Sequence, residues 1–176
     1  MPYNLGLNHT GMRRFNAGAP VGGTSQIWTL TFGGTIVASA TCSFKITWNG
    51  FATAAILWSA TNATLVANID AALEALGVIG TGGVTTAVAA MTAGIGTITI
   101  TGAGNLGVAA LPAMSVASSL EGTAPTVAVA TTTAGVDATH RGADIGVTLT
   151  DTTNGKLYIN SGTALAPTWT VVGSQS

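Results

Sequence analysis

Two stretches near the start of the chain alternate strictly between apolar and polar residues, and this alternation constrains the fold more than any other feature. The apolar positions are Trp28, Leu30 and Phe32 in the first stretch, and Cys42, Phe44, Ile46 and Trp48 in the second. A period of two residues is that of a β-strand with one buried face. Asn49-Gly50 follows the second stretch directly and favours a tight turn between antiparallel strands. We therefore predict an antiparallel sheet whose large side chains share one face.

One segment has the period of a helix instead. Its apolar residues recur every three or four positions over about 62–76, at Leu65, Ile69, Leu73 and Leu76. Thr61 or Asn62 is expected to cap its start, and Gly77 to end it in a left-handed conformation. A helix of this length is marginal by itself, so its apolar stripe is expected to pack on the sheet.

Strands return after this helix, at residues 84–91, 95–101 and 126–132, with a glycine-delimited segment at 108–117 between them. Runs of strands around a single helix indicate an α+β chain rather than a doubly wound parallel sheet. The predicted class is α+β, mostly β: an antiparallel, sandwich-like domain with one helix packed on it, an extended N-terminal arm and a C-terminal β-hairpin unit.

The chain is expected to divide into four parts. Residues 1–25 show no sustained period and are predicted to be an extended arm, and residues 26–135 form the β-rich core domain. Residues 136–144 hold three charges and little apolar content, which is typical of a connector. Residues 145–176 form a small β unit, which buries too little to stand alone and is expected to dock on the main domain or on a neighbouring subunit.

The small β unit is predicted to contain a hairpin. Asp151 opens its turn, where it is expected to accept backbone hydrogen bonds, and Asn154-Gly155 closes it. In the strand that follows, Leu157 and Ile159 are expected to face inward, and Lys156 and Tyr158 outward.

Charge is scarce along the whole sequence. Charged residues make up 6% of the chain, with five Lys and Arg and a net charge of -1, whereas about 25% is usual. So few bases argue against nucleic acid as a main partner, and no apolar run approaches the roughly 20 residues that a membrane-spanning helix needs. A neutral surface packs against other subunits without desolvating ions, so obligate assembly is the first hypothesis.

Residue types that carry catalysis or bind metals are few and scattered. His9 and His140 are the only imidazoles, and Cys42 occupies an inward strand position. Asp70 and Glu74 lie one turn apart on the predicted helix, where solvation is favoured over a glycosidase-like pair. We expect no enzyme activity, no catalytic residue, no cofactor and no metal site. With a single cysteine and no secretory signal pattern, synthesis and folding in the cytoplasm are the simplest expectation.

The predicted arm is richer in anchors than a free tail needs. We take it as a partner-binding segment with six candidate residues: Leu5, Leu7, Met12, Arg13, Arg14 and Phe15. Arg13 and Arg14 are two of the five basic residues of the chain.

Most of the chain resembles phage structural proteins. The stretches GTSQIWTLTFGG, CSFKITWNGFATAAILWSATNATLVANIDAALEALGVIGTGGV, TAGIGTITITGAGNLG and GTAPTVAVATTTAGV resemble a β-rich module of virion proteins of tailed bacteriophages, especially those of actinobacteria. LTDTTNGKLYINSGTALAPTWTVVGS resembles the closing hairpin motif of phage head proteins. The arrangement of arm, module and hairpin is similar to that of capsid decoration (cement) proteins.

This resemblance implies a non-enzymatic virion protein on the outer surface of the capsid. It implies that the chain, made in the host cytoplasm, binds the major capsid protein of the assembled head, often as a homotrimer at threefold positions, and stabilises the shell. Arg13 and Arg14 would face acidic capsid patches, and Leu5, Leu7 and Phe15 would lie in grooves.

Two other functions stay open. Related modules also occur in phage tail and fibre proteins. A carbohydrate-binding adhesion module on the virion surface would instead expose aromatic residues, and Trp28, Trp48, Trp58 and Trp169 are the candidates. Three of these four alternate with core-facing residues in predicted strands, which favours core packing.

Overall fold

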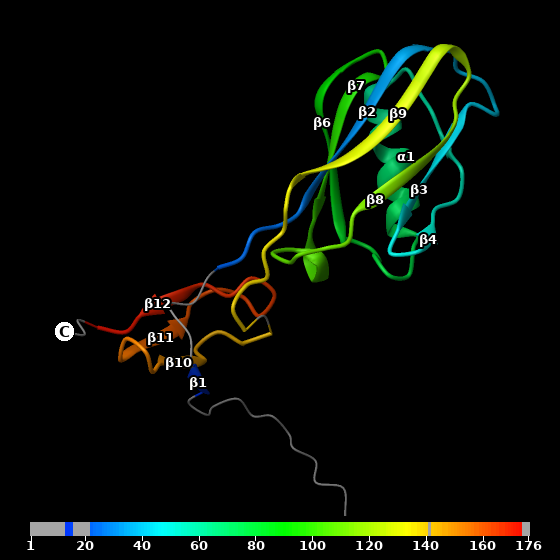
Figure 1. The fold of residues 1–176 in the computed structure, drawn as a ribbon. Helices are drawn as coiled ribbons and strands as arrows, with labels where there is room; N and C mark the ends of the chain where they lie inside the picture. The colour runs from blue at the N-terminus through cyan, green and yellow to red at the C-terminus, as the bar shows by residue number, and fades with distance from the viewer. Residues whose placement is uncertain (1–12, 16–21, 141, 174–176) are drawn as a thin grey trace, which may run out of the picture. The chain divides into compact units, whose positions relative to one another are not determined.

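The chain forms two compact units in a computed structural model that describes residues 13–15, 22–140 and 142–173 (Figure 1). The larger unit spans Thr24–Val136, and the smaller one contains the described residues before Thr24 and after Val136. The predicted class is confirmed, since the described residues are mostly β with antiparallel sheets and one α-helix.

The first sheet of the larger unit has four antiparallel strands in the order β6-β7-β2-β9. These are β2 (Ile27–Ile36), β6 (Val84–Thr92), β7 (Ile95–Gly102) and β9 (Gly122–Thr133). Trp28 lies opposite Ile100, and Leu30 lies opposite Ile98. All four are fully buried, so the predicted alternation of β2 is confirmed and defines the inner face of this sheet.

A second sheet is built around the central strand β3. Its members are β3 (Ser43–Trp48), β4 (Phe51–Ala52), β5 (Ile56–Leu57) and β8 (Met114–Ser119). β4 and β5 pair with opposite ends of β3, and β8 pairs with β3 along its whole length. Asn49 and Gly50 both have positive φ, 50° and 83°, which gives the predicted two-residue hairpin loop between β3 and β4.

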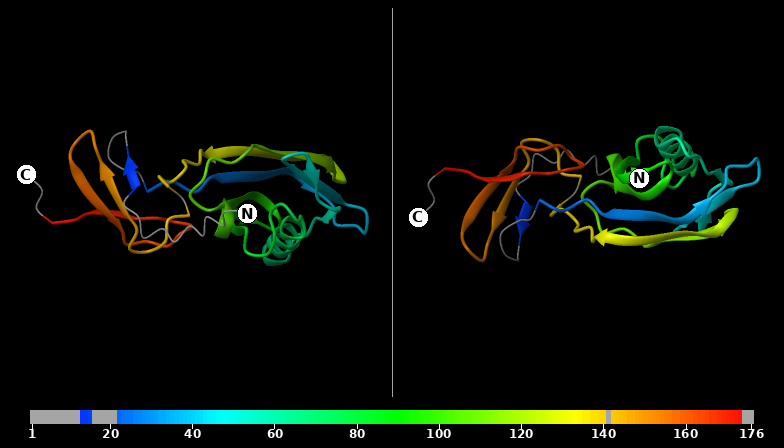
Figure 2. Two further views of the ribbon diagram at one scale, coloured as in Figure 1. Left: turned by 90° about the horizontal axis from the view of Figure 1, so that it is seen from below. Right: turned by 90° about the horizontal axis from the view of Figure 1, so that it is seen from above.

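The helix α1 (Asn62–Glu74) lies on the inner side of the first sheet, beside the second sheet (Figure 2). Leu65, Ile69 and Leu73 are fully buried, which confirms the predicted stripe. Phe32 of the first sheet and Phe44 of the second meet edge to face with ring centroids 5.2 Å apart. The core thus fills the space between one sheet and a layer made of a helix and a second sheet.

Both predicted ends of α1 need correction. Thr61 occupies the N-cap position, but its side chain makes no capping hydrogen bond. Gly77 does not have a positive φ, because the chain beyond the helix stays in tight turns in which Ile79 and Gly80 donate to the Leu76 carbonyl. The buried Ile79 side chain anchors these turns, and the left-handed conformation falls at Gly80 instead.

The smaller unit is a four-stranded sheet in the order β1-β10-β11-β12. Its strands are β1 (Arg13–Phe15), β10 (Thr148–Asp151), β11 (Lys156–Asn160) and β12 (Trp169–Val171), and a short 3-10 helix, η1 (Gly104–Leu106), belongs to the larger unit. β1 pairs in parallel with β10, and the other pairs are antiparallel. A strand at 13–15 was not expected within the predicted arm.

The predicted orientation of β11 is wrong. Tyr158 and Asn160 are buried, whereas Ile159 is 37% exposed. Register explains the reversal: Tyr158 lies opposite the fully buried Leu149 of β10, and cross-strand partners share a face of the sheet.

The buried stripe of α1 gives a direct test of this packing. Replacing Ile69 by Ala should lower the free energy of unfolding of the larger unit by about 2–5 kcal/mol, because it leaves a cavity under the helix. Thr64→Ala, an exposed change in the same helix, should shift it by no more than about 0.5 kcal/mol. Urea unfolding followed by tryptophan fluorescence measures both, and equal stability of the two variants would contradict the packing.

Candidate interaction face

The outer face of the first sheet is built from threonine and alanine. Its outward residues are Ile27, Thr29 and Thr31 on β2, Thr97, Thr99 and Thr101 on β7, Thr85 and Ala87 on β6, and Thr126, Ala128 and Ala130 on β9. None of the four strands contains a Lys, Arg, Asp or Glu residue. We call this surface the threonine face.

The register of the strands orders the threonine face into rows. Thr31 lies between Thr97 and Ala128, and Thr29 lies between Thr99 and Ala130. Neighbours are about 4.8 Å apart across strands and about 6.8 Å apart along a strand. The result is a regular array of hydroxyl and methyl groups.

Neither α1 nor the second sheet covers the threonine face, because both pack on the inner face of the first sheet (Figure 2). Thr31, Thr85 and Ala128 are exposed on it. An uncharged surface of this kind forms contacts without the desolvation of ions, and its hydroxyl groups donate and accept hydrogen bonds. The face is therefore suited to docking another neutral surface.

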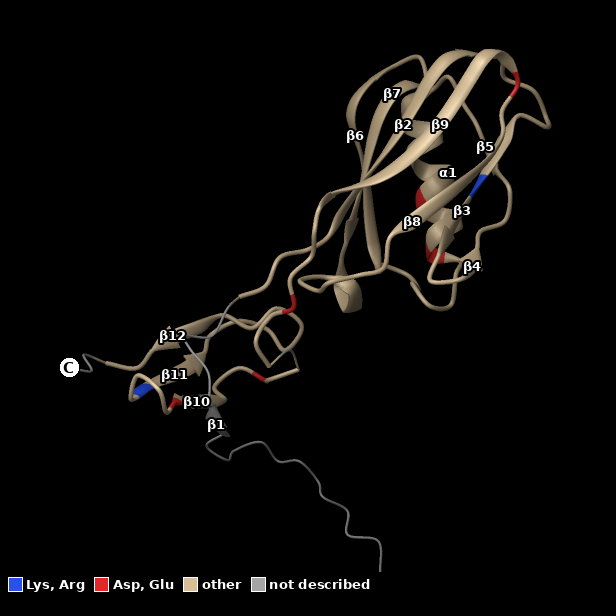
Figure 3. Cartoon of the chain, viewed as in Figure 1, with Lys and Arg blue, Asp and Glu red and all other residues tan. Residues whose placement is uncertain are grey.

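The charged residues of the larger unit lie away from this face (Figure 3). Lys45 is exposed on the second sheet, and Glu121 lies in the connection between β8 and β9, where its carboxylate accepts hydrogen bonds from the hydroxyls of Ser39 and Thr41. Glu74 accepts a 2.6 Å hydrogen bond from the Gly82 amide. Each of these two carboxylates therefore stabilises a different loop of the larger unit.

The structure describes three of the six predicted partner-binding residues. Leu5, Leu7 and Met12 lie outside the described residues. The backbone of Arg13, Arg14 and Phe15 forms β1, in register with Leu149, Thr150 and Asp151. This basic pair therefore belongs to a strand at the edge of the small sheet.

Two buried amides hold the loops of the protein together, and periodicity gave no sign of either. Asn160 donates to the carbonyls of Ala143 and Asp144, and its Oδ1 accepts from the amides of Gly162 and Thr168. In the larger unit, Gln26 donates to the Pro112 carbonyl and accepts from the Leu111 and Gly135 amides. A polar residue that fixes loops breaks no hydrophobic pattern, so sequence reasoning has no signal for it.

Asp151 has the turn-forming role predicted for it. Its Oδ1 accepts from the backbone amides of Thr153 and Asn154, and its Oδ2 accepts a 2.6 Å hydrogen bond from the Asn154 side chain. The Asn154 side chain contributes most to holding the pKa of the carboxyl below 3.8, although burial opposes this shift. The two backbone amides and the nearby charge of Lys156 lower the pKa further.

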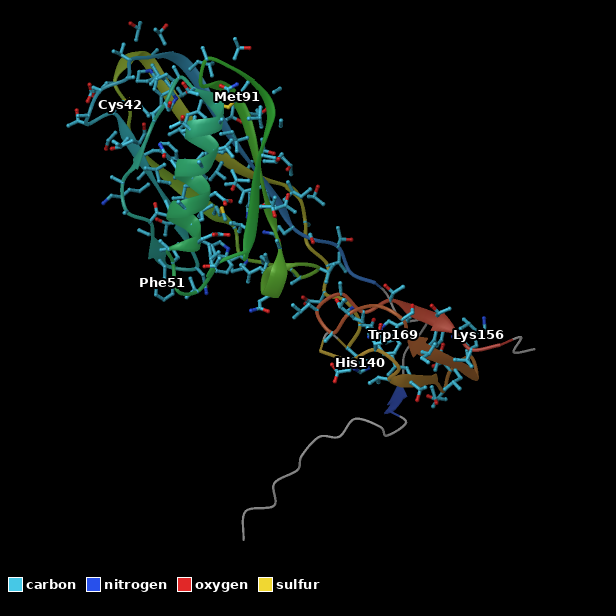
Figure 4. The ribbon with its side chains drawn as sticks, turned by 180° about the vertical axis from the view of Figure 1, so that it is seen from behind. Cys42, Phe51, Met91, His140, Lys156 and Trp169 are labelled. Atoms are coloured by element: carbon cyan, nitrogen blue, oxygen red, sulfur yellow. The ribbon has the colours of Figure 1, made fainter. Side chains whose placement is uncertain are left out.

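The residues considered for chemistry belong to different units, and Figure 4 labels one in each, Cys42 and His140. Cys42 is a buried free thiol, and His140 lies in the smaller unit, where its ring meets Trp169 edge to face at 6.5 Å. Within 13–15, 22–140 and 142–173, no three His, Cys, Asp or Glu side chains are grouped so as to hold a metal ion. No described helix is long and apolar enough to cross a membrane.

Core packing was predicted for three of the four tryptophans, and three are buried. Trp28, Trp48 and Trp58 are 0%, 4% and 6% exposed, and Trp169 is half-buried and donates to the Thr139 carbonyl. The larger unit thus has no tryptophan platform on its surface.

No protein-family model matches the chain, and no curated protein or solved structure matches it either.

The turn at Asp151 predicts a pH dependence. Because the folded pKa lies below 3.8, the ionised carboxyl contributes stability above that pH, and this contribution is lost as the pH falls below about 4. Asp151→Asn has no carboxyl to protonate, so it should lose less stability than the wild type as the pH falls below about 4. At pH 7 it should be less stable than the wild type. Amide NMR signals of Thr153 and Asn154 during urea titrations report on this unit, and an identical pH dependence in both proteins would contradict the assignment.

Proposed function

We propose that the chain is a non-enzymatic structural protein of a tailed-phage particle, and that it is a decoration protein binding the major capsid protein of the assembled head. The observation that supports this proposal most directly is the uncovered threonine face, a four-stranded surface without charge. The resemblance of the sequence to phage head proteins supports the capsid as the surface that it meets.

The chemistry of the face fits a repeating protein lattice. A neutral patch has no long-range attraction for acidic or basic molecules, so its contacts depend on shape and on many short hydrogen bonds. A rigid sheet presents such contacts at fixed spacings, with little conformational entropy lost on binding. Binding to the assembled shell alone stabilises the shell by mass action, because the bound protein must be released before the shell opens.

The first test compares the same substitution on two sides of the larger unit. Purified protein should co-sediment with expanded heads of the phage that encodes it. Thr31→Lys places a charge in the middle of the threonine face and should weaken this binding at least about tenfold, which corresponds to about 1.4 kcal/mol. Thr64→Lys, on the exposed side of α1, should bind as the wild type does.

Two outcomes would contradict this proposal. One is equal head binding by Thr31→Lys and wild type. The other is a particle map that places the chain on tails or fibres instead of heads.

The N-terminal segment is the second part of the proposal, as a latch on the capsid surface. A deletion of residues 1–12 tests it best, because a longer deletion would also remove β1 from the small sheet. The shortened protein should keep its circular dichroism spectrum and lose most of its head binding in the same sedimentation assay. Full binding by the shortened protein would reject the latch.

A further inference from the structure

The strand β9 is an open edge of the first sheet (Figure 1). Among the described residues it pairs with β2 alone. In an antiparallel pair, only part of the N–H and C=O groups of a strand point toward its partner. The remaining backbone groups of β9 point outward, where another strand can bind them.

The middle of β9 lacks the features that usually protect an edge strand. Proteins protect such edges with charged residues, prolines, bulges or short strands. β9 begins irregularly, with positive φ at Gly122 and Ala124 and with Pro125 next to them. β9 also ends with a register shift, because Thr132 is an extra residue between Thr131, the partner of Trp28, and Thr133, the partner of Ile27. The residues between these two ends, Thr126 to Thr131, contain no charge, no proline and no register shift.

The opposite edge of the sheet differs. β6 carries a register shift between Val88 and Ala90, so one extra residue interrupts its regular pairing. Such a bulge bends the strand and spoils its edge as a template for a further strand. The shift in β6 lies in the middle of the strand, whereas the shifts in β9 lie at its ends and leave six residues in uninterrupted register. We therefore call β6 the protected edge and β9 the open edge.

We propose that β9 pairs antiparallel with β9 of a second copy across a two-fold axis. The two strands have the same length and no charge, so the pairing brings Thr, Ala and Val against their own kind without repulsion. Val127 and Val129 face the core but are only half-buried, and a second copy covers them further. One contact of this kind satisfies both open edges and leaves none for a third copy.

The geometry restricts the register. Cross-strand partners lie on the same face, so an inward residue must meet an inward residue and an outward one must meet an outward one. The two-fold axis must therefore pass midway between one residue and the same residue of the second copy. One position within 126–131 faces its own copy.

The contact is small. Six paired residues form a contact only about 20 Å long and one strand wide, so it buries less than the about 800 Å² per partner of a standard stable interface. The dimer should therefore form in the micromolar range or above and must be sought at high concentration.

Light scattering on the purified chain tests the proposal without any phage component, so its result is independent of the proposed function. Between about 5 μM and about 500 μM, a range of about 2.7 kcal/mol, the mass should rise from 17.3 kDa toward twice that value. Ala128→Lys should abolish the rise, because it places like charges close to the axis. Ala87→Lys is the matched control, since it makes the same exposed change on the protected edge β6, and it should leave the rise unchanged.

Crosslinking gives a second readout that does not depend on a disruptive variant. Single cysteines at each position of 126–131 should form a disulfide-linked dimer most readily at one position, and the native Cys42 is buried and does not compete. A monomeric mass at every concentration, a trimeric mass, equal effects of the two Lys variants or uniform crosslinking would each overturn the proposal.

Discussion

The larger unit depends on the burial of one face of β2 against a composite second layer. Trp28, Leu30 and Phe32 come from a single strand and are each at most 2% exposed. They require cover on one side, which α1 and the second sheet supply together, and Phe32 touches Phe44 across the two layers. Because α1 is amphipathic and β3 alternates, neither element would be stable without the surface that β2 provides. The same alternation places Thr29 and Thr31 on the outer face, so the period of two residues in β2 produces both the core face and the threonine face.

Much of the larger unit was predictable because its strands are regular. The alternation of apolar and polar residues predicted β2 and β3, and Asn49-Gly50 predicted the hairpin loop. The spacing of Leu and Ile residues predicted the buried side of α1. These signals are local, since each depends on side chains a few residues apart. The threonine face was foreseen only as a neutral surface, because its four strands come from distant parts of the sequence and their order follows from long-range pairing.

The smaller unit was harder to predict for a physical reason. Its strands are three to five residues long, too short for alternation to choose between faces. The sequence pattern favoured Ile159 as inward, but pairing with Leu149 buries Tyr158 instead. Asn160 then occupies the next buried position, where its four hydrogen bonds offset the cost of burying an amide. In so small a unit, satisfying buried polar groups decides the fold as much as apolar burial does.

A neutral surface changes how unwanted association must be prevented. Most soluble domains are kept apart by charges of both signs, and few such charges lie on this chain. Unwanted association must then be limited by the backbone geometry of the sheet edges. The two edges of the first sheet differ in that geometry. If both edges were regular, β6 of one copy would pair with β9 of the next, and such a head-to-tail contact propagates into a fibre unless it closes. The bulge in β6 blocks that route, whereas two-fold pairing through β9 ends after two copies. An asymmetric pair of edges thus limits assembly in a chain that has too little charge to limit it by repulsion.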